Sequence, residues 1–126
     1  MNTLSTVSPT NRLLGTQMTQ KYLNVTEEQT ANFMIGGRGF LLRLYPFRKL
    51  MYMDLTEGDN VIFSGKRVIQ NRWILPAHIA QGVGNLRFET YPSDKNDYVW
   101  WDGFNTKFRL MVYTFDELPK DEEEDS

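Results

Sequence analysis

The chain has 126 residues, 40% of them hydrophobic, which suits one domain with a hydrophobic core and is too short for two. The absence of cysteine excludes a disulfide framework and thiol chemistry. No apolar run approaches the roughly 18–20 residues of a membrane span, and the chain does not begin with a charged signal peptide, so we expect a soluble protein without membrane contact. The net charge of −2 is uneven, because five acids lie at 121–125 and the rest of the chain has 11 acids against 14 bases.

Residues 1–30 are rich in Ser, Thr and Asn and form a predicted extended N-terminal arm. A short helix from Asn11 to Leu23 is one interpretation, because residues 14, 18 and 22 share a helical face. Two readings of the arm stay open. It is either a flexible leader or a segment that orders against a neighbouring subunit and buries Leu13, Leu14 and Tyr22 there.

Several strands are predicted to follow, and those between Gly39 and Ile69 form a β-meander of two consecutive hairpins. The first covers Gln29–Ile35 and ends in a glycine-rich turn, 36–39. The second, Phe40–Tyr45, is expected to end at Pro46, because proline has no N–H for the ladder. The third, Leu50–Leu55, alternates, with Met51, Met53 and Leu55 on one face and Tyr52 and Asp54 on the other.

Turn residues at 56–60 then lead into an apolar strand from Val61, with a bulge or bend expected at Gly65. The only helical spacing in the body predicts one short helix at about Pro76–Ala80. A strand at Asn85–Tyr91 with Leu86 and Phe88 inward, a long loop at 92–106 and a closing strand at Lys107–Tyr113 complete the pattern.

These elements predict an all-β fold. We expect a small single-domain barrel or sandwich of about six or seven mostly antiparallel strands with one short helix. The predicted boundaries are an N-terminal arm at 1–30, a β domain at 31–118 and an acidic flexible tail at 119–126.

The sequence offers little for catalysis, and no enzyme activity, cofactor or metal site is predicted. His78 is the only histidine, and its apolar neighbours favour a structural role. The acids Asp54, Glu57 and Asp59 cluster around a turn, where such residues serve turn chemistry. The glycines at 36–39 precede a strand rather than a helix, which excludes a phosphate loop.

An aromatic loop is the candidate binding element. It contains Tyr98, Trp100, Trp101 and Phe104, and two adjacent tryptophans cannot both face inward in an extended segment. One reading makes the loop a lid over an open barrel, and the other makes it a partner-binding surface. In the second reading we expect Trp100, Trp101 and Phe104 to dominate the interface energy.

An acidic tail behind a mildly basic body, together with exposed aromatics, also describes phage single-stranded DNA-binding proteins. The bases here are spread singly along strands, and the tail ends Asp125-Ser126 without a terminal aromatic residue. This function is therefore the alternative, and nucleic acid is the less favoured partner.

The order of the strand motifs resembles the small baseplate plug domain of contractile-tailed bacteriophages over about residues 31–118. The resemblance is carried by Gly39-Phe-Leu-Leu-Arg-Leu, Leu50-Met-Tyr-Met-Asp-Leu with Gly58, Ile62-Phe-Ser-Gly-Lys-Arg-Val-Ile, Gly84-Asn-Leu-Arg-Phe and Phe108-Arg-Leu-Met-Val-Tyr. It is one of pattern, without a catalytic signature.

The resemblance implies a structural role in the virion. A small β subunit of the tail baseplate, made in the host cytoplasm, would contact the hub and neighbouring baseplate or tube subunits within a large assembly. An assembly chaperone whose acidic tail mimics a partner is a third class. Such a chaperone would be absent from finished particles, whereas a DNA binder would lose affinity steeply with salt.

Overall fold

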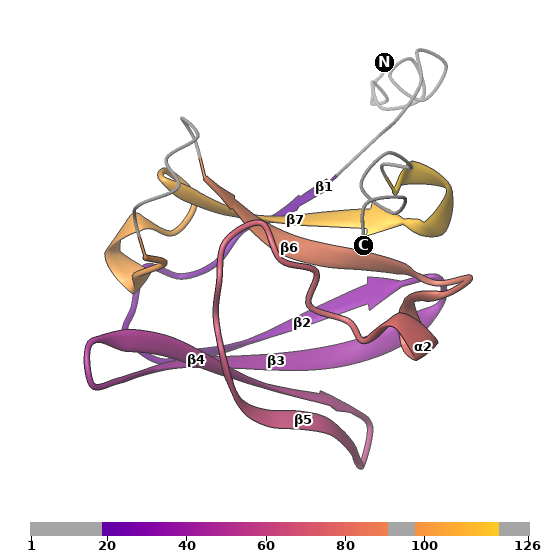
Figure 1. Cartoon of the computed structure of the whole chain (residues 1–126), viewed down its shortest axis with the longest axis horizontal. Coiled ribbons are helices and arrows are strands. Elements are labelled where there is room, and N and C mark those ends of the chain that lie inside the picture. The colour runs from indigo at the N-terminus through magenta and orange to yellow at the C-terminus, as the bar shows by residue number, and fades with distance from the viewer. Residues whose placement is uncertain (1–18, 91–97, 119–126) are drawn as a thin grey trace, which may run out of the picture.

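The computed structural model describes residues 19–90 and 98–118, which form two antiparallel sheets stacked as a sandwich (Figure 1). The four-stranded sheet has the order β2-β3-β4-β5, and the three-stranded sheet has the order β1-β7-β6. The all-β prediction is confirmed, as a sandwich rather than a closed barrel. The strands are β1 (Thr19–Lys21), β2 (Gln29–Ile35), β3 (Arg38–Phe47), β4 (Leu50–Glu57), β5 (Asn60–Arg67), β6 (Gly84–Thr90) and β7 (Phe108–Thr114).

Tight two-residue turns build the predicted meander of the four-stranded sheet. Gly36 and Gly37 join β2 to β3 with positive φ angles of 58° and 80°, the backbone that hairpin turns require. Gly58, with a φ of 59°, begins the turn between β4 and β5. Arg48 and Lys49 join β3 to β4 and also have positive φ, although neither residue type favours it.

The prediction that Pro46 ends its strand is wrong, because β3 continues through it to Phe47. Phe47 and Leu50 close a two-residue turn and therefore form a hydrogen-bonded pair. Pro46, one residue earlier, then directs its nitrogen away from β4. The nitrogen points toward the side of β2, but β2 does not reach Pro46, because its pairing with β3 extends only to Gln29 opposite Leu44. No ladder hydrogen bond is lost at the proline.

The core lies between the two sheets and confirms the predicted alternation. Met51, Met53 and Leu55 of β4 are all buried, as are Leu86 and Phe88 of β6. The side chain of Phe88 stacks on Phe104, with ring centroids 5.7 Å apart, at the centre of this core. The alternation on both sheets therefore sets which residues fill the space between them.

Residues 19–30, placed in the arm by the sequence, belong in part to the sandwich. Thr19–Lys21 forms β1 and pairs with β7, so residues 19–23 are not the helix suggested for Asn11–Leu23. Leu23 is buried, and its backbone N–H and C=O both bond the side-chain amide of Asn105, at 2.9 and 2.6 Å. Leu13, Leu14 and the rest of 1–18 lie outside the described residues.

The helical elements are short. α2 (Ala77–Ala80) follows Pro76, as predicted, and the 3₁₀ helices are η1 (Trp101–Gly103) and η2 (Phe115–Glu117). None of the helices in the described part of the chain has the length and apolar character needed to cross a membrane. The predicted bulge at Gly65 is confirmed, because the register of β4 and β5 shifts there and Gly65 has a φ of 70°.

The chain itself covers much of the outer face of the three-stranded sheet. The Trp73 ring packs edge-on against Tyr113 at 5.5 Å, and the Arg87 guanidinium lies 4.2 Å from the Trp73 ring centroid. Tyr113 donates a 2.5 Å hydrogen bond to Glu89. Burial, together with this carboxylate, raises the pKa of Tyr113 to about 12. The outer face of the three-stranded sheet is therefore covered in part by side chains of the same chain.

Candidate protein interface

The candidate site is the outer face of the four-stranded sheet, on the side away from the core (Figure 1). No other described strand or helix lies over it. The strand registers place the outward side chains in rows across the sheet, because residues directly opposite each other share a face. This outer face consists of Thr30, Asn32, Met34, Leu41, Arg43, Tyr45, Phe47, Leu50, Tyr52, Asp54, Thr56, Val61 and Arg67.

One end of the outer face is apolar. Leu41 pairs with Asn32 on β2 and with Thr56 on β4, and Thr56 pairs in turn with Val61. Val61 is 64% exposed and Met34, on the neighbouring row, is 67% exposed. An open pocket of about 450 Å³ lies among these rows. Apolar side chains around a shallow pocket are typical of surfaces that bind proteins.

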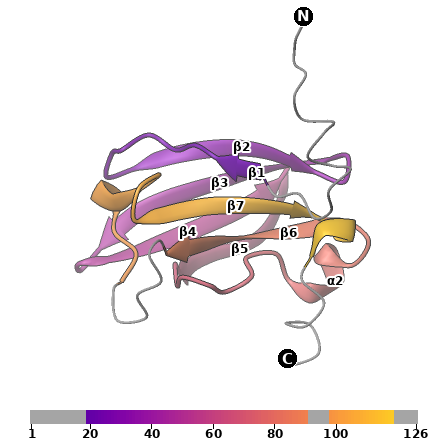
Figure 2. The same ribbon diagram turned by 90° about the horizontal axis from the view of Figure 1, so that it is seen from above.

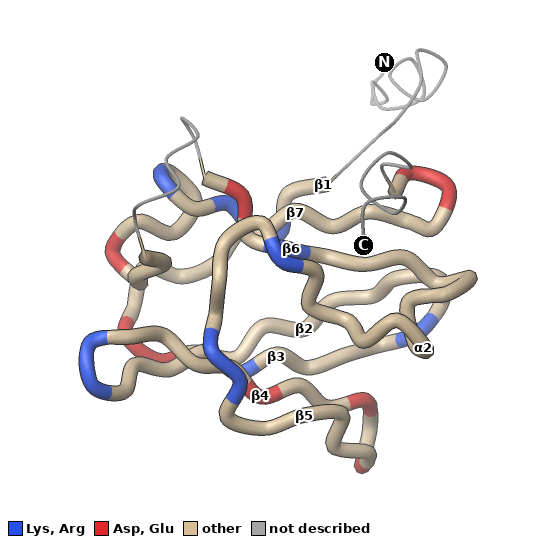
Figure 3. Tube along the Cα trace, viewed as in Figure 1, with Lys and Arg blue, Asp and Glu red and all other residues tan. Residues whose placement is uncertain are grey.

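The other end of the outer face is aromatic. Tyr45 and Tyr52 stack with ring centroids 6.3 Å apart, and Phe47 meets Tyr52 edge-on at 6.0 Å. Phe47 remains 55% exposed at the hairpin tip. The turn residues Arg48 and Lys49 surround this end with positive charge, visible as a blue segment in Figure 3. Exposed aromatics held by neighbours and rimmed by charge are the residues that most often dominate protein interfaces.

A polar network between the two ends keeps the outer face rigid. The Asp54 carboxylate accepts hydrogen bonds from the Gly65 N–H at 2.7 Å, the Tyr45 hydroxyl at 2.9 Å and Arg43 at 3.3 Å. Arg43 also pairs with Glu28 at 2.6 Å. The bulge in β5 makes this possible, because it turns the Gly65 N–H toward β4. Burial opposes the charge on Asp54, but the three donors outweigh it and lower its pKa.

We expect Asp54→Asn to reduce the free energy of unfolding at pH 7 by about 1 to 2 kcal/mol, the scale of hydrogen bonds to a charged group that is partly exposed. The folded-state pKa of Asp54 is lowered, so its contribution is present above the unfolded pKa of about 4 and is lost as pH falls through the folded value. Urea unfolding from pH 7 to pH 2 measures both effects. The two proteins should converge at low pH, whereas a constant gap would contradict the assignment to charge. Asp59→Asn, at an exposed turn residue, is the matched control and should change little.

The structure separates the residues that the sequence predicted as an interface. Tyr22 and Tyr98 are 72% and 66% exposed, and the Arg67 guanidinium lies 5.0 Å from the Tyr98 ring centroid. Trp100 and Trp101 are partly buried and pack against the core. Phe104 is 1% exposed, so its ring belongs to the core and not to the surface of the isolated chain. The turn of η1 directs Phe104 inward onto Phe88.

The outer face was missed as a candidate site. The run Phe40-Leu41-Leu42 carries a signal that could have found it, because a half-buried strand alternates and this run does not. Phe40 and Leu42 are buried, which leaves Leu41 on the opposite face. Phe47, after the proline, was missed because the strand was expected to have ended.

The described residues show no group of three or more His, Cys, Asp or Glu side chains placed to hold a metal ion. The acids that the sequence places around one turn, Asp54, Glu57 and Asp59, do not act as one group in the structure. Asp54 belongs to the polar network, whereas Glu57 forms a two-pronged pair with Arg38 at 2.7 and 2.6 Å. The Arg38 hydrogen bond lowers the pKa of Glu57 despite the opposing effect of desolvation.

The sequence was compared with models of known protein families. The family model described as cyanophage baseplate Pam3 plug gp18 matches residues 20–116, which is more than half of the chain. The match begins within β1, at residue 20, which is earlier than the resemblance at 31–118 suggested. No curated protein matches the chain.

Proposed function

This chain belongs to the family of the cyanophage baseplate Pam3 plug gp18, and we propose that it is a non-enzymatic structural subunit of a phage tail baseplate held by protein contacts. The outer face of the four-stranded sheet carries the proposal. It presents exposed apolar and aromatic side chains on a rigid two-layer body, while the chain covers the equivalent face of the other sheet with Trp73 and Arg87. Such a face suits burial against a neighbouring subunit.

The chemistry of the outer face indicates what the neighbour presents. Phe47 and Tyr52 need an apolar hollow, and the turn residues Arg48 and Lys49 at their rim favour acidic groups around it. We assign this surface to the hub or an adjacent baseplate or tube subunit. On this proposal the protein is made in the host cytoplasm and stays in the finished virion.

Purified phage tails test the proposal. Mass spectrometry should find the chain in finished particles, and lysine cross-linking should join Lys49 to another tail protein. Lys107 is the comparison lysine, because it precedes β7 in the other sheet. Absence of the chain from purified tails would refute the structural role and favour the assembly chaperone.

The alternative function, single-stranded DNA binding, has one specific observation in its favour. Arg67, Arg72 and exposed Tyr98 line an open pocket of about 450 Å³, and base stacking beside positive charge is how such proteins bind. The tryptophans are less suited, since Trp100 and Trp101 pack on the core and Trp73 lies between Tyr113 and Arg87.

We therefore expect titration with poly-dT to leave the fluorescence of the three tryptophans unchanged at both low and high salt. A tyrosine-only contact is checked by filter binding with wild-type protein and Tyr98→Ala. Saturable binding at low salt that disappears at high salt, and that Tyr98→Ala weakens, would overturn the baseplate assignment in favour of nucleic acid.

A further inference from the structure

The sandwich is open along one side, where β1 and β2 lie at the edges of their sheets. β1 pairs only with β7, and β2 pairs only with β3. Figure 2 shows the two strands on the same side of the molecule. In the described residues no strand lies between them, so each has a row of backbone groups facing a gap.

The hairpin geometry identifies which backbone groups of β2 face this gap. Ile35 and Arg38 close a two-residue turn and form a hydrogen-bonded pair, so every second residue of β2 bonds β3. Thr30, Asn32 and Met34 are the intervening residues. Their N–H and C=O groups point away from β3, and within the described part of the chain no other backbone or side chain bonds them.

β2 lacks the features that protect edge strands. Its seven residues, Gln-Thr-Ala-Asn-Phe-Met-Ile, include no charge and no proline, and its register with β3 is regular. The opposite edge strand, β5, has two register shifts, Gly65 at a bulge, and Lys66 with Arg67 at its end. Natural proteins use such bulges and charges to prevent strand pairing. One edge of this sheet is thus blocked and the other is left available.

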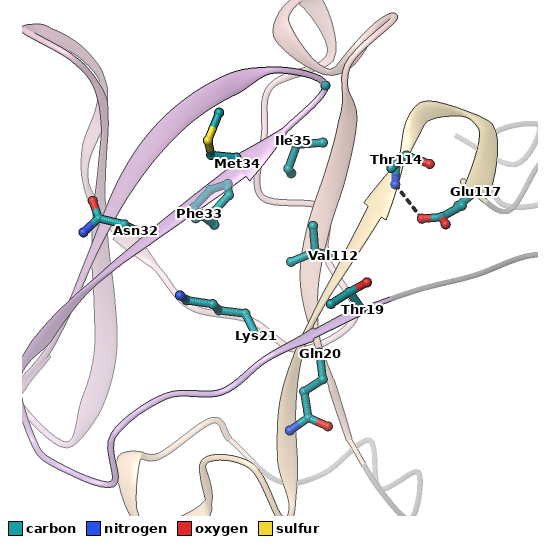
Figure 4. Close-up of a pocket in the computed structure, with 11 residues that line it drawn as sticks. Thr19, Gln20, Lys21, Asn32, Phe33, Met34, Ile35, Val112, Thr114 and Glu117 are labelled. Carbon is teal, nitrogen blue, oxygen red and sulfur yellow. Dashed lines mark hydrogen bonds between the residues drawn. The ribbon is translucent and has the colours of Figure 1, made fainter. Parts of the chain in front are cut away.

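An open groove of about 490 Å³ lies along the available edge (Figure 4). Phe33 and Ile35 line it from β2, and Val112 lines it from β7. Lys21 projects from β1 into the groove, and no ion pair joins it to another described residue. Glu117 lies at the other end, where its Oε1 accepts a 2.9 Å hydrogen bond from the Thr114 N–H. Among the described residues, the Lys21 ammonium group in the groove therefore has no ion-pair partner, whereas the Glu117 carboxylate accepts a hydrogen bond.

We propose that β2 is a docking edge at which an extended segment of another tail protein adds as a further strand. The segment bonds the backbone of Thr30, Asn32 and Met34. It directs an apolar side chain toward Val112 and an acidic side chain, two residues away on the same face, toward Lys21. The inference rests on the proposed baseplate function and adds the mode of attachment and the chemistry of the partner.

Hydrogen exchange measured by mass spectrometry tests the docking edge without altering the protein. In the free protein, the amides of Thr30, Asn32 and Met34 should exchange rapidly, whereas Ala31 and Phe33 are held by β3. In assembled baseplates the three free amides should slow by at least about tenfold as they become paired. If the chain is present in baseplates and these amides exchange as in the free protein, the docking edge is refuted while the structural role stands.

Two substitutions test the chemistry of the partner. Asn32→Pro removes one free-edge N–H without touching the β2–β3 ladder, and Lys21→Glu reverses the charge in the groove. Each should lower incorporation into baseplates by about tenfold or more, because a lost strand bond or a like-charge contact weakens docking. Lys66→Glu makes the same charge change on β5 at the opposite edge and should leave the three amides protected.

Melting curves of the isolated variants confirm that they fold. If the folded Lys21→Glu variant is incorporated normally, the proposal that the docked segment carries an acidic side chain is refuted. Protection of the three amides in the isolated protein at high concentration would replace the tail-protein strand by a second copy of this chain. Absence of the chain from baseplates would instead refute the proposed function itself.

Discussion

Replacing Gly84 with alanine is expected to lower the free energy of unfolding by about 3 to 5 kcal/mol, because among the described glycines an added Cβ collides most closely here. Gly84 begins β6 with a φ of 129°, which an L side chain rarely adopts. A Cβ atom there would overlap the Tyr113 carbonyl oxygen and come within 2.6 Å of Ile35 Cγ2. Neither neighbour can retreat, because Tyr113 belongs to the ladder with β6 and Ile35 is buried in the facing sheet.

Gly37→Ala is the matched control. Gly37 also has a positive φ, 80°, but no atom lies within 4 Å of the position of an added Cβ. It should lose only about 1 to 2 kcal/mol, the cost of the backbone conformation alone. Urea unfolding of the two variants separates strain from collision. Equal losses would mean that the close approach of β6 to β7 and β2 does not constrain Gly84.

Phe47→Ala is expected to weaken incorporation into the baseplate by about 30-fold, equivalent to the roughly 2 kcal/mol of an interface hot spot. Phe47 is 55% exposed and contacts Tyr52 only edge-on, so the isolated chain should lose less than about 1 kcal/mol of stability. Competition between tagged wild-type and variant protein during tail assembly, quantified by mass spectrometry of particles, measures the ratio directly.

Phe115→Ala supplies the comparison, since Phe115 is similarly exposed, at 47%, but belongs to η2 beyond the end of β7. It should compete almost equally with wild-type protein. A variant at Phe47 that assembles as well as the one at Phe115 would remove the outer face from the interface. The Phe47 result is separate from the β2 tests, because Phe47 lies at the β3–β4 turn and does not line the groove between β1 and β2.

Local patterns in the sequence predicted most of the framework. Met51, Met53 and Leu55 alternate with polar residues, and a strand with one buried face needs that spacing. Gly36 and Gly37 predicted their turn, because a short hairpin needs two positive φ angles that glycine tolerates. Arg48 and Lys49 adopt the same backbone without such a signal, held by the pairing of Phe47 with Leu50.

The candidate site was less accessible from the sequence, because exposure depends on what the chain places over each side chain. Phe104 and Tyr98 come from one aromatic loop, yet one lies in the core and the other is 66% exposed. β1 has only three residues and little pattern of its own. It depends on β7 and on the amide of Asn105 beside Leu23, 82 residues distant along the chain.

The sequence by itself determined the fold class, the meander and the family resemblance, because side-chain alternation and turn chemistry act between neighbouring residues. The tertiary structure alone decided which sheet face stays uncovered and which edge stays unpaired. Those properties arise from the stacking of β6 and β7 on β3 and β4 and from the end of β1 beside β2. Contacts between residues far apart in the chain set both surfaces, and no local pattern encodes them.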